Sequence, residues 1–272
     1  MNIFEKILYL LQKEMPEPTP FGWYHLLCIG IMIFLIVILF LRRKKHNEKQ
    51  LKIVLATYGI IALVLEILKQ LIWSFNYDPI TKLIVWDYEW YSFPFQLCTT
   101  PIYISLICLL LKKGKLRDSL LSYLAFFTIL GSISTIILPE SCFVEDILVN
   151  IHTMYLHLGS FVVSVYLLFT KEIKINKKNF ISATIVFLSL TTIAEILNIS
   201  IYHSGILNGE TFNMFYISPY FISSLPVFDI IQKNVPYILY LLIYIVALSI
   251  GAYIIYLISL GINKIFPKSK SK

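Results

Sequence analysis

The chain has 272 residues, of which 58 % are hydrophobic and only 14 % are charged. Soluble domains average about 25 % charged residues, because water must solvate their surface. With a mean hydropathy of +0.76, the sequence excludes a soluble globular protein and predicts one that folds in lipid. The net charge of +7 does not indicate nucleic-acid binding, because that function needs a basic face on a water-soluble domain.

The first predicted element is a short amphipathic helix within residues 1–20. Apolar side chains recur at helical spacing from Ile3 to Leu11, and a proline-rich stretch then ends the helix. This pattern is typical of a helix that lies in the membrane interface. It does not indicate a signal peptide, because charges interrupt the apolar run and no small-residue cleavage site follows.

Seven apolar stretches near the ~20 residues needed to cross a bilayer come next. They are residues 22–41, 51–73, 94–111, 119–138, 150–170, 180–201 and 236–262. The third and fifth begin with polar residues, but the need to satisfy backbone groups in lipid still favours helix there. The sequence therefore predicts an all-α polytopic membrane protein. Its regions are an interfacial helix (1–20), a seven-helix membrane domain (21–263) and a basic tail (264–272).

The predicted loops differ strongly in charge. Most of the 23 Lys and Arg residues fall in the first, third and fifth loops and in the C-terminal tail. Because cytoplasmic loops are enriched in Lys and Arg, this distribution places the N-terminus outside the cell membrane and the C-terminus inside. Two longer outer loops, about 74–93 and 202–235, are rich in aromatic residues, and we expect them to cap the outer face.

Polar side chains gather near the outer ends of five of the predicted spans, whereas the inner halves are almost purely apolar. Ionisable groups inside spans usually face the bundle interior, so the simplest arrangement is a polar cavity that opens outward. The alternative is that each group caps a helix or joins neighbouring helices. The residues expected at this cavity are Glu66, Lys69, Gln70, Gln96, Thr99, His152, Glu195 and Asn198.

Two carboxylates lie within the predicted spans. Glu66 and Lys69 are three residues apart on one helix, so we expect a structural ion pair. Glu195 has no basic residue near it in its own span. Its expected partner is therefore on another helix, such as His157 or Lys69, unless the carboxyl is protonated.

Cys98 and His157 are the candidate catalytic residues. Cys98 is expected to begin a helix just after Pro94, and a helix N-terminus can activate a thiol as a nucleophile. His157 is predicted at a comparable depth on another helix, where it can act as general base. Three alternatives stay open: Cys98 is a small apolar filler, it forms a disulfide with Cys142, or Thr99 or Thr100 is the nucleophile instead.

Metal and cofactor motifs are not indicated by the sequence. His152 and His157 are five residues apart, which does not match the zinc-binding HExxH pattern. The four cysteines have no CxxC spacing. We therefore expect neither a metal nor a cofactor.

Several short motifs, taken in order, resemble a known group of proteins. They are FPFQLC at 93–98, ILGSISTIILPE at 129–140, MYLHLGSFVVSVYLL at 154–168, Asn213–Phe215 and Pro236–Tyr237. The chain is similar in these motifs to the YwaF-like integral membrane proteins of bacteria, which share a domain with the eukaryotic transmembrane protein 164. Glu66 and Gln70 resemble a family pattern of glutamate followed four residues later by histidine. Gln70 and Gln96 stand where histidines are usual.

The resemblance implies acyl transfer, because the eukaryotic relatives are described as moving a fatty acyl chain onto lyso ether phospholipids. It would make Cys98 the acyl-accepting nucleophile and His157 its base, with Glu66 and Gln96 as orienting or oxyanion-side groups. We therefore expect a membrane-embedded acyltransferase or lipid hydrolase that acts on phospholipid acyl chains through this Cys/His pair. The implied partner is a phospholipid or lysophospholipid of the membrane.

Two other classes of function stay open. In a non-enzymatic binder or transporter, Glu66, Lys69, His157 and Glu195 would form a proton-linked or ligand-linked site. In a scaffold protein, the outer loops would bind a partner. The sequence does not determine the oligomeric state.

Overall fold

The computed structural model describes residues 2–78, 80–139 and 142–265. Within these residues, six helical segments are long and apolar enough to cross a membrane. They are α2 (Trp23–Leu41), α3 (Glu48–Ile72), the consecutive α5 (Lys115–Phe126) and α6 (Thr128–Ile137), α7 (Ile147–Phe169), α8 (Lys177–Ser204) and α10 (Tyr237–Ile265). The all-α polytopic architecture is confirmed. Most of the predicted basic tail, residues 266–272, lies outside the described residues.

The span predicted over 94–111 is instead a shorter helix, α4 (Thr100–Leu110). Its 11 residues rise about 16 Å, well short of the ~30 Å hydrocarbon core. Six rather than seven helices therefore have spanning length. The reason is proline chemistry: Pro101 stands in the first turn of α4, where its fixed φ favours starting a helix rather than continuing one.

The segment that contains α4 nevertheless runs along the whole of α3 in the opposite direction. At its beginning, the carbonyl of Ser92 accepts a hydrogen bond of 2.8 Å from Gln70 near the end of α3. At its end, Lys113 forms an ion pair of 3.1 Å with Glu48 at the start of α3. The segment from Ser92 to Lys113 therefore matches the length of α3, and the residues on either side of α4 are not α-helical.

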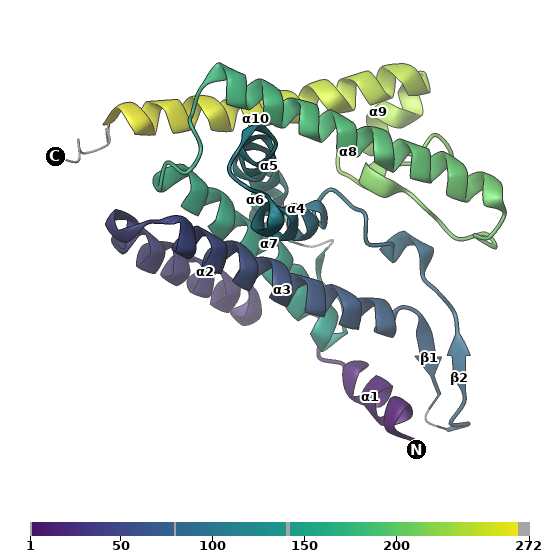
Figure 1. Cartoon of the computed structure of the whole chain (residues 1–272). Coiled ribbons are helices and arrows are strands. Elements are labelled where there is room, and N and C mark those ends of the chain that lie inside the picture. The colour runs from purple at the N-terminus through teal and green to yellow at the C-terminus, as the bar shows by residue number, and fades with distance from the viewer. Residues whose placement is uncertain (1, 79, 140–141, 266–272) are drawn as a thin grey trace.

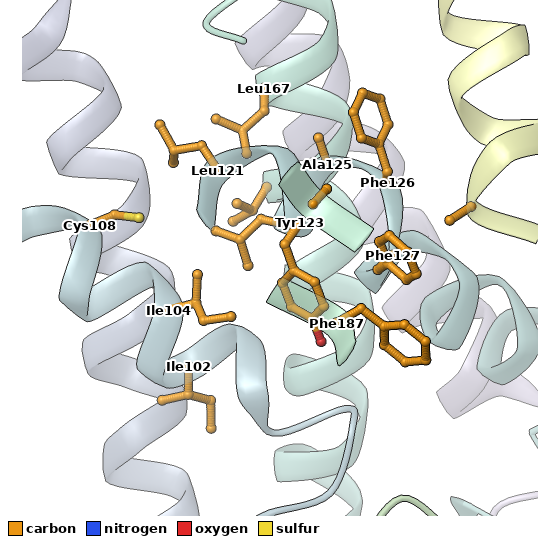
Figure 2. Packing of buried hydrophobic residues seen from close by; sticks show 14 of the residues in the cluster. Ile102, Ile104, Cys108, Leu121, Tyr123, Ala125, Phe126, Phe127, Leu167 and Phe187 are labelled. Carbon is orange, nitrogen blue, oxygen red and sulfur yellow. The ribbon is translucent and has the colours of Figure 1, made fainter. Parts of the chain in front are cut away.

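The helices form three layers (Figure 1). α8 and α10 run along one side of the molecule, α2 and α3 run along the other, and α4, α5 and α6 lie between them. The core lies where the middle layer packs against its neighbours. Figure 2 shows part of it, where Phe127 stacks on Phe187 of α8 with ring centroids 4.8 Å apart. Tyr123, Phe126 and Phe187 are fully buried there.

Two small elements lie at the N-terminal end of the molecule (Figure 1). The predicted interfacial helix is α1 (Ile3–Leu11), which begins with a capping box between Asn2 and Glu5. An antiparallel hairpin of β1 (Phe75–Tyr77) and β2 (Ile84–Trp86) follows α3. The hairpin is absent from the sequence prediction because three-residue strands are too short to show an alternating pattern. It contacts α1 through the edge-to-face rings of Phe4 and Phe75.

An ion-pair network joins three loops at the opposite end. Arg117, only 2 % exposed, contacts Glu48 at 2.8 Å and Glu172 at 3.8 Å. His46 bridges Glu172 and Tyr166, each at 2.8 Å. This end of the molecule holds most of the basic residues, and the acidic side chains of Glu48 and Glu172 link its segments through ion pairs.

Candidate functional site

Between α8 and α9 (Phe228–Asn234) the chain folds back into the bundle as a segment without α-helix, largely buried over residues 212–218. It contains the 3₁₀ turn η4 (Met214–Tyr216). The members of this segment that are 0 % exposed are Phe212, Met214, Phe215, Ile217 and Ser218. Irregular backbone inside a membrane protein needs protein partners for its N–H and C=O groups, because lipid supplies none.

Gln96 supplies two of these partners. Its side-chain amide donates to the carbonyl of Asn213 at 3.0 Å and accepts from the N–H of Phe215 at 2.8 Å. Phe215 and Tyr216 have φ values of 57° and 59°, a left-handed conformation that is unfavourable for residues other than glycine. The clamp formed by Gln96 therefore helps to hold a strained turn in place.

Asn198 of α8 clamps the same turn from the other side. Its amide donates to the carbonyl of Met214 at 3.0 Å and accepts from the N–H of Met214 at 2.7 Å. Asn198 is 0 % exposed, so no water competes for these bonds. Gln96 and Asn198, both predicted site residues, thus hydrogen-bond to the backbone of the η4 segment.

Cys98 lies in the turn that precedes α4, two residues before the first helical residue. It does not begin the helix as predicted, because the helix starts later, at Thr100. The carbonyl of Gln96 accepts hydrogen bonds from the N–H groups of Thr99 and Thr100 at 3.0 and 3.3 Å. Gln96 therefore connects the Cys98 turn directly to η4. Cys98 itself is half-buried.

The two neighbouring threonines are engaged with backbone. The Thr99 hydroxyl donates to the carbonyl of Gln96 at 2.9 Å. The Thr100 hydroxyl donates to the carbonyl of Leu97 at 2.8 Å and lies 2.8 Å from the hydroxyl of Tyr123. Both hydroxyl groups are therefore engaged in hydrogen bonds within the protein.

A buried charged cluster lies at the end of α3. Glu66 contacts Lys69 at 2.7 Å, which confirms the predicted ion pair, and its other oxygen contacts His152 of α7 at 2.8 Å. These three residues are 2 %, 8 % and 3 % exposed. Gln70 donates to Glu66 at 2.9 Å, so a glutamine in the position of a usual family histidine still bonds to the glutamate.

The Cys98 thiol lies within electrostatic range of Glu66 and Lys69. It is also within range of buried tyrosine hydroxyls from four different elements. These tyrosines are Tyr58, Tyr123, Tyr216 and Tyr244. The Tyr244 hydroxyl has no hydrogen-bond partner among the described residues. The sequence analysis missed all four, because a tyrosine inside an apolar run gives no polar signal.

His157 lies near this cluster but is held elsewhere. Its ring hydrogen-bonds to the backbone of Gly131 in α6, and it interacts electrostatically with His152. Across the described parts of the chain, no hydrogen bond joins His157 to Cys98. All four cysteines are thiols, Cys98 and Cys142 included.

Glu195 has a different partner from either of those expected. The hydroxyl of Tyr237, at the start of α10, donates to it and lies 3.0 Å from the carbonyl oxygen of Ile217. The partner is on another helix, as expected, but it is Tyr237 rather than His157 or Lys69. Through Tyr237, Glu195 links α8 to α10 beside the η4 segment.

Comparison with known proteins agrees with the motif analysis. The chain matches the TMEM164 family over residues 20–256. It belongs to the TMEM164 family. The matched range contains Cys98, the Glu66 cluster and the η4 segment, and α1 lies before it. No curated protein and no solved structure matches the chain. Family membership establishes a multi-pass membrane protein and does not by itself assign an activity.

Proposed function

We propose that this TMEM164 family protein is a membrane acyltransferase that holds an acyl chain on Cys98 as a thioester. The observation that supports this most is the setting of Cys98. It is a half-buried thiol in a turn fixed by Gln96, within electrostatic range of the Lys69 ammonium. Burial and the nearby Glu66 favour the neutral thiol and Lys69 favours the thiolate, which is the nucleophilic form of cysteine. The attack therefore needs a base that takes the thiol proton.

The reaction takes two steps. The Cys98 sulfur attacks the ester carbonyl of a phospholipid, the ester C–O bond breaks, and an acyl thioester and a lysophospholipid form. The thiol proton passes to His157, which must first release its hydrogen bond to the backbone of Gly131 to act as general base, and then to the departing oxygen. In the second step the hydroxyl of another lysophospholipid attacks the thioester, its proton passes through the same histidine, and the thiol is regenerated.

We propose that the substrate site faces the outer leaflet of the cell membrane. The basic loops then lie inside, with the N-terminus outside and the C-terminus inside. This orientation needs an odd number of crossings. The seventh crossing is the segment from Ser92 to Lys113, which runs antiparallel to α3 and includes α4.

Labelling with an alkyne-tagged fatty acyl thioester tests this proposal on the purified full-length protein in detergent. We expect hydroxylamine-sensitive labelling of the wild type, loss of labelling in Cys98→Ser, and at least about tenfold slower labelling in His157→Ala. Cys108→Ser is the matched control, because Cys108 is a buried thiol of α4. Unchanged labelling of Cys98→Ser overturns the proposal.

The second candidate function is a non-enzymatic binder or transporter. The observation that favours it is the buried charged cluster of Glu66, Lys69 and His152, because ionisable groups inside membrane proteins often mark transport pathways. In this case Glu66→Gln abolishes uptake or binding and Cys98→Ser has no effect. If the protein is an acyltransferase, Cys98→Ser abolishes its activity instead.

A further inference from the structure

A cavity of about 720 Å³ lies at the end of the molecule that holds α1 and the hairpin. Its walls come from the segment after α1, the end of α3 with β1, the segment after β2, and the residues just before α7. Neither Cys98 nor any residue of the Glu66 cluster lines it. One wall, residues 9–14, precedes the range matched to the family.

Hydrogen bonds hold these walls together. The side chain of Gln12 donates to the carbonyl of Phe75 at 2.8 Å. The N–H of Met15 donates to the carbonyl of Glu145 at 2.8 Å, and the N–H of Ile147 donates to the carbonyl of Lys13 at 3.0 Å. The N-terminal segment is thus bonded both to the hairpin and to the start of α7. The cavity is preformed, as small-molecule sites usually are.

The lining is rich in carboxylates. Glu14, Asp87, Glu89 and Asp146 line the cavity, with Lys13 as the basic residue among the lining side chains. In the described parts of the chain, none of these four carboxylates forms an ion pair. Burial and the nearby Glu210 and Asp87 raise the pKa of Glu89.

The pKa of Asp146 is also raised. Burial and the nearby carboxylates of Glu14 and Glu145 raise its pKa above the usual range. A raised carboxyl pKa means that the folded protein disfavours the ionised form. The protein therefore leaves negative charge around the cavity uncompensated, and a bound cation would neutralise it.

Aromatic side chains also line the cavity. Trp73 and Tyr91 lie with ring centroids 4.8 Å apart, and Tyr9 and Tyr77 lie 6.5 Å apart edge to face. Ring faces attract cations through the quadrupole of the π system, and such rings recognise quaternary ammonium groups. A bare metal ion would instead need a compact set of oxygen ligands.

We propose that this cavity binds a small organic cation that bears a quaternary ammonium group. Carboxylates supply the attraction, and the rings of Tyr9, Trp73, Tyr77 and Tyr91 supply faces for a group that has no N–H to donate. A choline-type group of this kind occurs both on soluble cations and on lipid headgroups, so the experiment has to separate these two sources.

Equilibrium dialysis with radiolabelled choline tests the proposal on the full-length protein in an uncharged maltoside detergent. We expect saturable binding, weakened by about tenfold or more in Glu89→Gln and in Asp146→Asn. Asp229→Asn is the matched control, because it removes the same charge from α9 (Phe228–Asn234), outside the cavity. The neutral isostere 3,3-dimethylbutan-1-ol should not compete. Tyr91→Leu, which removes an exposed ring rather than a charge, should also weaken binding.

A second arm identifies the source of the cation. In phosphatidylglycerol nanodiscs choline should bind as in detergent. Loss of binding in phosphatidylcholine nanodiscs supports a lipid headgroup as the occupant, and unchanged binding there supports a soluble cation. Absence of saturable binding, equal affinity in the three cavity variants and the wild type, or competition by the neutral isostere overturns the proposal.

Discussion

Glu66→Ala is expected to lower the free energy of unfolding by about 3–5 kcal/mol. Glu66 is the counter-charge of Lys69 at 2.7 Å and also contacts His152 at 2.8 Å, and all three are buried. Removing the carboxylate leaves the buried Lys69 ammonium without a counter-charge, which costs far more than the loss of an exposed ion pair. Equilibrium unfolding of the detergent-solubilised protein by sodium dodecyl sulfate measures the change.

Two further variants make this prediction specific. Glu66→Leu combined with Lys69→Met removes both charges and should recover a large part of the loss, because an apolar pair has no uncompensated charge. Asp229→Ala breaks an exposed ion pair with Lys233, 3.7 Å long, and should cost less than about 0.5 kcal/mol. Equal losses for Glu66→Ala and Asp229→Ala would contradict the buried-cluster interpretation.

Asn198→Leu is expected to cost about 2–4 kcal/mol of stability. Leucine has a similar volume but offers no amide, so the N–H and C=O of Met214 lose their side-chain partners in a fully buried turn. The Cys98 turn is bonded to the same segment through Gln96. We therefore expect slower acyl labelling of Cys98 in this variant as well as a lower thermal midpoint of unfolding.

Asn234→Leu is the matched control for this substitution. Asn234 is exposed at the end of α9 and bonds only to the carbonyl of Ile230, so its loss should change stability by less than about 0.5 kcal/mol. A stability of Asn198→Leu equal to that of the wild type would show that the η4 segment does not depend on the clamp.

Hydropathy alone predicts the long helices well, because in lipid every backbone polar group must bond within its own helix. The bounds of α2 and α7 lie within three residues of the stretches read from the sequence. The stretch at 94–111 was misjudged in length because hydropathy averages over a window and gives no weight to Pro101. The count of apolar residues does not show where a helix begins.

The contacts of the candidate site residues were predicted only in part. Glu66 and Lys69 pair as expected, because three residues on one helix fix their relative position. The partner of Glu195 is 42 residues away, and Phe215 is 119 residues from Gln96. Such contacts depend on how each helix is rotated about its axis, which packing determines and the sequence pattern does not show.

The central proposal is that Cys98 accepts an acyl chain from a membrane phospholipid. Peptide mass spectrometry tests it most directly, after incubation of the purified protein in phospholipid nanodiscs and rapid acid quenching. The account predicts one acyl chain on the peptide that contains Cys98. This chain should be released by neutral hydroxylamine, absent from Cys98→Ser and present in Cys108→Ser. An unmodified Cys98 peptide with acyl transfer still occurring, or an acyl chain on Thr99 or Thr100 instead, would contradict the claim.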